Sequence, residues 1–265
     1  MAAPQLPLAD FFALARQLGT PHVEIRNDIS GEAILDGTSA AEVKRLAAEN
    51  DVTIISINAL QKFNLWSAER AEEAEALAAY CAESGAKALV LVADNSGQAF
   101  DSATRIAHAT EALSGLVPIL RRHGIIGLVE CLGFESCTLR SKKEAVAAID
   151  AANGRDVLRL THDTFHHHLA GEADIFPELT GLIHISGVED PAIAVADMRD
   201  SHRLLVGPRD RLDNLGQIAA LRRGGYTGPL SFEPFAEELR HLPDPAAALR
   251  QSMTFITDAL KARAA

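Results

Sequence analysis

Cysteine is scarce in this sequence: only Cys81, Cys131 and Cys137 occur among its 265 residues, and their spacing is not that of a zinc ribbon. A sparse, odd set of thiols is typical of a reducing compartment. Long apolar runs are also missing, which excludes a membrane-spanning helix. The first residues lack the basic start and apolar stretch of a secretory signal. We therefore expect a cytoplasmic protein with buried thiols and no membrane partner.

Positive charge is in short supply as well. The sequence has 25 lysine and arginine residues against 36 aspartate and glutamate residues, a formal net charge of -11. Proteins that bind a nucleic-acid backbone usually carry a basic surface, so this balance argues against nucleic acid as the main partner. The sequence also has neither a phosphate-binding glycine-rich loop nor a Gly-x-Ser-x-Gly nucleophile motif. We expect a small-molecule ligand and no nucleophilic catalysis.

Apolar residues, by contrast, are plentiful. They make up 48% of the sequence and charged residues 23%, which allows a large hydrophobic core. No linker-like segment divides the chain, so residues 1–265 are expected to form a single domain. Short apolar runs predict strands at 22–26, 53–58, 88–92, 125–131, 157–162, 181–185 and 229–233. Amphipathic segments predict helices at 8–18, 39–49, 67–84, 101–123, 141–152, 172–179, 212–223 and 244–262.

This alternation of strands and helices predicts an α/β fold with parallel strands buried on both faces. Repeats of this kind close into a (β/α)8 TIM barrel. Only seven strands are clear. An eighth would have to lie within residues 1–6, and that segment is too short and is interrupted by proline. The first strand of the barrel is therefore expected to be rudimentary or missing. The open sheet edge would have to be covered by the N-terminal segment, by the last strand, or by a partner chain in a homodimer.

Four potential metal ligands each stand at the carboxyl end of a predicted strand. They are Glu130, Asp163, His184 and Glu233. The carboxyl ends of barrel strands surround one mouth, where enzymes of this architecture build their sites. Two glutamates, an aspartate and a histidine form a suitable ligand set for one divalent cation. Taken singly, Glu130 could also be a buried acid paired with a basic residue, and His184 a core histidine with its hydrogen bonds satisfied.

Other polar residues near the strand ends are less sharply defined. His166 follows Asp163 by about one helical turn and could face the same pocket, whereas His167 and His168 are expected in a solvated loop or at a helix start. Arg203 could bind a substrate oxygen or form a surface salt bridge. On and after the first two strands lie seven more candidates, of which one or two are expected to reach the cavity: Glu24, Arg26, Asn27, Asp28, Asn58, Gln61 and Lys62.

A set of short motifs runs along nearly the whole chain. The motifs are HVEIR at 22–26, INAL at 57–60 with FN at 63–64, VE at 129–130 with Gly133 and CT at 137–138, DTFH at 163–166, HI at 184–185 and SFE at 231–233. In type and order they resemble the xylose-isomerase-like TIM-barrel superfamily of sugar isomerases and epimerases, which also includes endonuclease IV. Within that superfamily they most resemble the 2-keto-myo-inositol isomerases, or inosose isomerases.

The resemblance implies one divalent metal ion, held by Glu130, Asp163, His184 and Glu233. It implies that Glu130 and Glu233 also act as acid and base. His166 and Arg203 would contact substrate oxygens, with His166 among the catalytic groups. Mn2+ is the favoured cofactor, and Mg2+, Co2+ and Zn2+ remain open.

The implied activity is that of a metal-dependent intramolecular oxidoreductase. It would isomerise a cyclic keto-polyol, 2-keto-myo-inositol, in inositol catabolism by proton transfer through an enediolate. A ketose 3-epimerase, a hydroxypyruvate isomerase or a dehydratase on the same site is the alternative. A metal-dependent endonuclease, disfavoured by the acidic balance, and a non-catalytic sugar-binding barrel are further readings. Residues 207–211 replace a more glycine-rich stretch of relatives, so substrate specificity is expected to differ.

Overall fold

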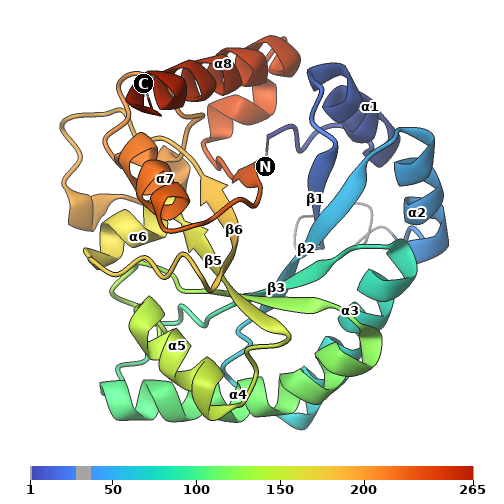
Figure 1. Cartoon of the computed structure of the whole chain (residues 1–265), viewed down its shortest axis with the longest axis vertical. Coiled ribbons are helices and arrows are strands. Elements are labelled where there is room, and N and C mark those ends of the chain that lie inside the picture. Colours follow the sequence, from blue (N-terminus) through green and yellow to red (C-terminus); the bar gives the residue numbers. More distant parts are fainter. Residues whose placement is uncertain (1, 28–36, 265) are drawn as a thin grey trace.

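The computed structural model describes residues 2–27 and 37–264. Within these ranges seven strands form one parallel sheet that follows the order of the chain, and helices surround it (Figure 1). The strands are β1 (His22–Arg26), β2 (Thr53–Gln61), β3 (Ala88–Val92), β4 (Ile126–Glu130), β5 (Leu158–Asp163), β6 (Thr180–Ile185) and β7 (Leu230–Phe232). The helices are α1 (Leu8–Leu18), α2 (Ala40–Glu49), α3 (Ala68–Ser84), α4 (Ser102–His123), α5 (Lys142–Ala151), α6 (Thr164–Ala170), α7 (Asn214–Arg223) and α8 (Pro245–Ala264). The predicted barrel with one strand missing is thus confirmed.

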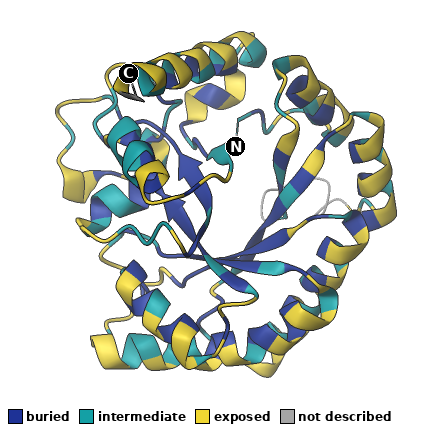
Figure 2. Ribbon diagram, viewed as in Figure 1, coloured by how far each residue is buried: buried dark blue, intermediate teal, exposed yellow. Residues whose placement is uncertain are grey.

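The two faces of each strand bury different apolar clusters, because successive side chains point to opposite sides. On β3, Leu89 and Leu91 belong to the cluster shared with the surrounding helices. Val90 and Val92 instead pack with Leu128 of β4 inside the ring. Figure 2 shows the buried residues concentrated on the strands and on the helix faces turned toward them. Alternate positions of every strand therefore face the interior of the barrel.

Several helix ends follow the signals read in the sequence. Ser39 caps α2 by accepting a hydrogen bond from the backbone N–H of Glu42 over 3.2 Å. Gly124 ends α4 in the left-handed conformation with a φ of 65°, which glycine adopts without strain. The three cysteines are free and buried, as expected. No helix in the described part of the chain is long and apolar enough to cross a membrane.

One predicted helix is wrong: the segment 172–179 contains no helix, and α6 lies directly after β5 instead. Asp163 accounts for the start of α6, because its carboxylate accepts hydrogen bonds from the backbone N–H groups of Phe165 and His166 over 2.7 and 3.1 Å. Gly171 ends the helix after two turns. A predicted ligand residue thus also fixes where the chain turns from strand to helix.

The ring is open between its first and last strands, since no pairing joins β1 to β7 among the described residues. A cavity of about 280 Å³ lies there, lined by both edge strands and by α1 and α8. Residues 2–6 form no strand, and Met1 lies outside the described residues. Ala3 instead joins an apolar cluster with Leu14 of α1 and Leu249 of α8. The N-terminal segment therefore covers part of the open edge.

Candidate metal centre

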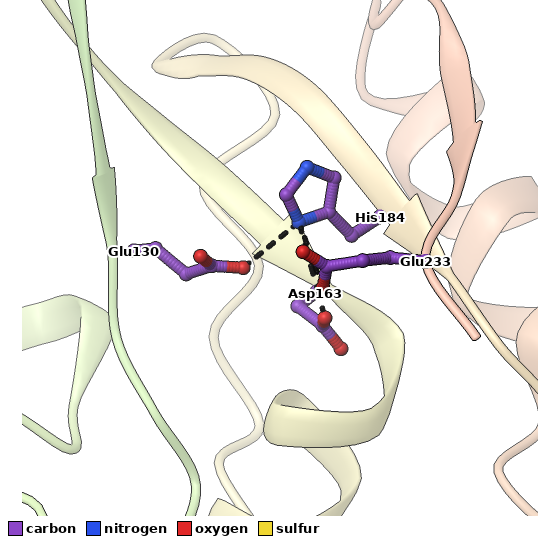
Figure 3. Close-up of side chains that lie close together, drawn as sticks. All are labelled: Glu130, Asp163, His184 and Glu233. Atoms are coloured by element: carbon purple, nitrogen blue, oxygen red, sulfur yellow. Dashed lines mark hydrogen bonds and ion pairs between the residues drawn. The ribbon is translucent and has the colours of Figure 1, made fainter. Parts of the chain in front are cut away.

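The alternation along the strands places the four predicted ligands on the inner face of the ring. Glu130, for example, follows the inward-facing Leu128 by two residues on β4. Asp163 and His184 end the inner rows of β5 and β6, and Glu233 comes directly after β7. Figure 3 shows the four side chains converging on one point. Strand register, rather than proximity in the sequence, brings them together.

The distances at this point are short. One ligand atom from each of the four residues lies within 4.8 Å of those of the other three, and all four residues are buried. The Nδ1 atom of His184 lies 2.9 Å from Oε1 of Glu130 and 3.3 Å from Oε2 of Glu233. It lies 4.0 Å from Oδ2 of Asp163. The imidazole therefore turns one specific nitrogen toward the three carboxylates.

Three carboxylates around one imidazole leave the centre with surplus negative charge. Burial lowers the pKa of His184, but the neighbouring carboxylates, led by Glu233, outweigh it and hold that pKa well above its usual value. Burial raises the pKa of Glu130, and it raises the pKa of Asp163 to about 6. Burial would also raise the pKa of Glu233, yet His184 and Arg203 hold it well below its usual value. A buried, oxygen-rich donor set that gathers surplus negative charge fits a divalent cation.

Arg203 is buried, with a residue exposure of 1%, so the reading of it as a surface salt bridge is wrong. Its Nη2 donates to Oδ2 of Asp163 over 2.6 Å and to Oε2 of Glu233 over 2.9 Å. The guanidinium stacks between the rings of Phe165 and Phe235, at 5.0 and 4.8 Å from their centres. Arg203 therefore holds two of the four predicted ligands in place.

Residues of the first two strands complete the centre, and the structure places three of the seven candidates there. Asp28 lies outside the described residues. Arg26 Nη1 and Asn58 Nδ2 donate to Oε1 of Glu233 over 3.0 and 2.9 Å. Glu24 lies on the other side of the imidazole, with Oε1 3.1 Å from Nε2 of His184. The signal for Glu24 and Arg26 was present in the sequence, because both lie on the inner row of β1.

A polar cavity of about 350 Å³ adjoins the centre. Four of the candidates line this cavity, namely Arg26, Asn58, Gln61 and Lys62, so the expectation that one or two would reach it was too low. Several other lining residues carried no signal in the sequence, among them Asn95, Phe134, Asp200 and Phe235. They lie outside the strands, where no periodic pattern marks a side chain as facing the mouth of the barrel.

His166 lines the same cavity from the first turn of α6. Its ring packs edge-on against Phe134 and Phe165, and its buried Nδ1 has no hydrogen-bond partner among the described residues. Burial lowers the pKa of His166 to about 4, so the imidazole is neutral at pH 7. His167 and His168 lie in α6 as well. His167 is half-buried, and its Nδ1 lies 2.6 Å from Nζ of buried Lys142.

Seven parallel strands in a ring, with an acidic cluster and a polar cavity at their carboxyl ends, define a (β/α)-barrel protein with its candidate site at the mouth. The chain belongs to the xylose isomerase-like TIM-barrel family, whose model matches residues 12–259. The resemblance found in the sequence motifs is thereby confirmed. No curated protein sequence matches the chain.

Solved structures show the same barrel. A xylose isomerase domain-containing protein from Salmonella typhimurium LT2 is 31% identical, with a TM-score of 0.88 over 98% of this chain and 94% of that one. The IolI protein, solved with a bound zinc atom, is 21% identical, with a TM-score of 0.84 over 97% and 94%. An L-ribulose 3-epimerase is 20% identical, with a TM-score of 0.72 over 96% and 89%. At such identities the last two comparisons establish a shared fold.

Proposed function

We propose that this protein is a divalent-metal-dependent sugar isomerase or epimerase whose substrate is a cyclic keto-polyol such as 2-keto-myo-inositol. One observation carries the proposal: four buried donor groups converge beside a polar cavity of about 350 Å³. The xylose isomerase-like family and the L-ribulose 3-epimerase structure support sugar chemistry. The zinc atom of the IolI structure supports a metal.

Glu130, Asp163, His184 and Glu233 would hold the ion. Three carboxylates and one imidazole suit Mn2+, Mg2+, Co2+ or Zn2+, of which we favour Mn2+. When bound, a divalent ion supplies Lewis acidity, which draws electrons from a ketone and makes the neighbouring C–H bond more acidic. The protein itself must then move the proton.

The two glutamates differ in how firmly they are held. Glu233 accepts hydrogen bonds from Arg26, Asn58 and Arg203, which stabilise its ionised form and make it the weaker base. Glu130 lies within hydrogen-bonding distance of His184 alone among the described residues. We therefore assign removal of the carbon-bound proton to Glu130. In isomerisation Glu130 would return the proton to the adjacent carbon, while the hydroxyl hydrogen passes to the former carbonyl oxygen. In 3-epimerisation a proton is added to the same carbon from the opposite face, where Glu233, itself held in its ionised form, would pass on a proton taken from water.

His166 and Arg203 would orient the substrate. A cavity of about 350 Å³ lies at the small end of small-molecule sites and suits a single sugar or cyclitol ring. His166, neutral at pH 7, lines the cavity, so its ring can bond a substrate hydroxyl. Arg203 also lines the cavity and can share its donors between the carboxylates and a substrate oxygen.

A panel of keto-substrates followed by proton NMR in deuterated water tests this function. The panel holds 2-keto-myo-inositol, a ketohexose and hydroxypyruvate, each with manganese-loaded protein. We expect an isomerised cyclitol ketone with deuterium at the carbon beside the carbonyl. Deuterium at an inverted centre with the carbonyl still in its original position would assign an epimerase, and loss of water would assign a dehydratase. Absence of both conversion and deuterium exchange with every substrate would overturn the proposal.

A further inference from the structure

The two ring nitrogens of His184 face different partners. Nδ1 lies 2.9 Å from Oε1 of Glu130 and belongs to the cluster of four (Figure 3). Nε2 points away from that cluster and lies 3.1 Å from Oε1 of Glu24. His184 is fully buried and the Glu24 side chain is 11% exposed, so bulk water does not replace either contact. Glu24 is the one carboxylate that touches this ring from outside the predicted ligand set, among the residues that the structure describes.

Glu24 is itself held from two sides. The hydroxyl of Ser56 on β2 donates to its Oε2, and Ser231 on β7 forms a second side-chain hydrogen bond with it. These partners come from β2, which pairs with β1, and from β7 across the open side of the ring. The carboxylate is thereby fixed in space before any ligand arrives. An ionised carboxylate can only accept hydrogen bonds, so before an ion binds both ring nitrogens of His184, each facing a carboxylate, carry a hydrogen.

We propose that Glu24 is a positioning residue: it would keep a hydrogen on Nε2 of His184 when a bound ion displaces the hydrogen of Nδ1, and so leave the Nδ1 lone pair aimed at the point where the three carboxylates converge. The inference rests on the proposed metal site. Histidines that bind metals commonly donate their other ring N–H to a carboxylate, which sets both the tautomer and the ring orientation. Glu24 would therefore strengthen ion binding without touching the ion.

Two substitutions separate this role from simple packing. Glu24→Ala removes the acceptor, whereas Glu24→Gln keeps an amide oxygen that can still accept from Nε2. We expect Glu24→Ala to raise the Kd for Zn2+ by about 10- to 100-fold, the range found for such partners of ligand histidines, and Glu24→Gln to raise it less. A chelator-competition titration measures both. Glu42→Ala and Glu42→Gln make the same changes on α2, at a side chain that is 43% exposed, and should leave the Kd unchanged.

A spectroscopic readout follows the tautomer directly. Long-range proton–nitrogen NMR of the zinc-loaded wild-type protein should show His184 with a protonated Nε2 and an Nδ1 shifted by the metal. In Glu24→Ala, loss of the acceptor should weaken the signal of protonated Nε2 or give a mixture of the two ring tautomers. This measurement on the wild type remains decisive even where the alanine variant fails to fold.

The outcomes separate the two proposals. A wild-type protein that binds no divalent ion would overturn the proposed function, and this inference with it. Wild-type binding with zinc on Nε2, or a Glu24→Ala Kd equal to that of the wild type, would overturn the role of Glu24 alone. Reduced affinity in Glu24→Ala with partial recovery in Glu24→Gln would support it.

Discussion

Arg26 donates a hydrogen bond over 3.0 Å from its Nη1 to Oε1 of Glu233, joining β1 to the residue after β7 across the open side of the barrel. Asn58 of β2 donates to the same oxygen, and Arg203 donates to the other. No main-chain pairing closes the ring at this place in the described chain. Side chains of the candidate site therefore bridge the first and last strands where the backbone does not.

Replacing Glu233 tests the centre of this bridge. Glu233→Gln preserves shape but removes one negative charge from the donor set and a proton-transfer group. We expect kcat to fall by about 10²-fold or more, with weaker metal binding. Glu237→Gln, a substitution on a side chain that is 73% exposed, serves as the control. A loss of only a few-fold in kcat would show that Glu233 is structural.

His166→Ala should separate substrate binding from metal binding. His166 lines the cavity but is not one of the four clustered donors. We therefore expect metal content, measured by elemental analysis, to stay near the wild-type value while kcat/KM falls at least about tenfold, as for a lost proton-transfer or hydroxyl contact. Loss of the metal in this variant would instead make His166 a ligand.

The burial of His166 also predicts a pH dependence of stability. Its pKa in the folded protein, about 4, lies below the 6.5 of a free imidazole. Between these two pH values the unfolded chain therefore binds a proton at this residue and the folded chain does not. The stability tied to neutral His166 is thus complete above pH 6.5 and is lost as the pH falls through 4, by at most about 3 kcal/mol.

Denaturant unfolding of metal-free protein between pH 7.5 and 4 measures this effect. The free energy of unfolding of the wild type should fall more steeply with decreasing pH than that of His166→Asn. His241→Asn, at a side chain that is 76% exposed, should follow the wild type. Parallel curves for the wild type and His166→Asn would show that the folded protein protonates His166 freely.

The open edge between β1 and β7 leads to a prediction about stability. A β-rich segment of about five residues, a typical strand length, fused ahead of Met1 could pair with β1 and fill the cavity of about 280 Å³ beside it. We expect a higher Tm than that of the unextended chain, and no gain from a glycine–serine segment of equal length. Equal Tm values for the two fusions would show that the edge is already satisfied, for instance by a second copy, which sedimentation would reveal.

Most of the barrel could be predicted from the sequence, because its buried parallel strands are short apolar runs. Glu130 and Glu233 could be picked out because each is an acid at the end of such a run. The position of α6 could not, since its start depends on the Asp163 carboxylate and its histidine-rich sequence carries little helical pattern. Burial of Arg203 was equally hidden, because it results from two aromatic rings distant in sequence. Contacts made only in the folded chain leave no local signal.

Removal of the metal tests the central proposal most directly. Protein treated with EDTA and shown by elemental analysis to hold no ion should lose turnover of 2-keto-myo-inositol, and about one equivalent of Mn2+ per chain should restore it. Full turnover by the metal-free protein would contradict the proposed role of Glu130, Asp163, His184 and Glu233 as ligands of a catalytic ion.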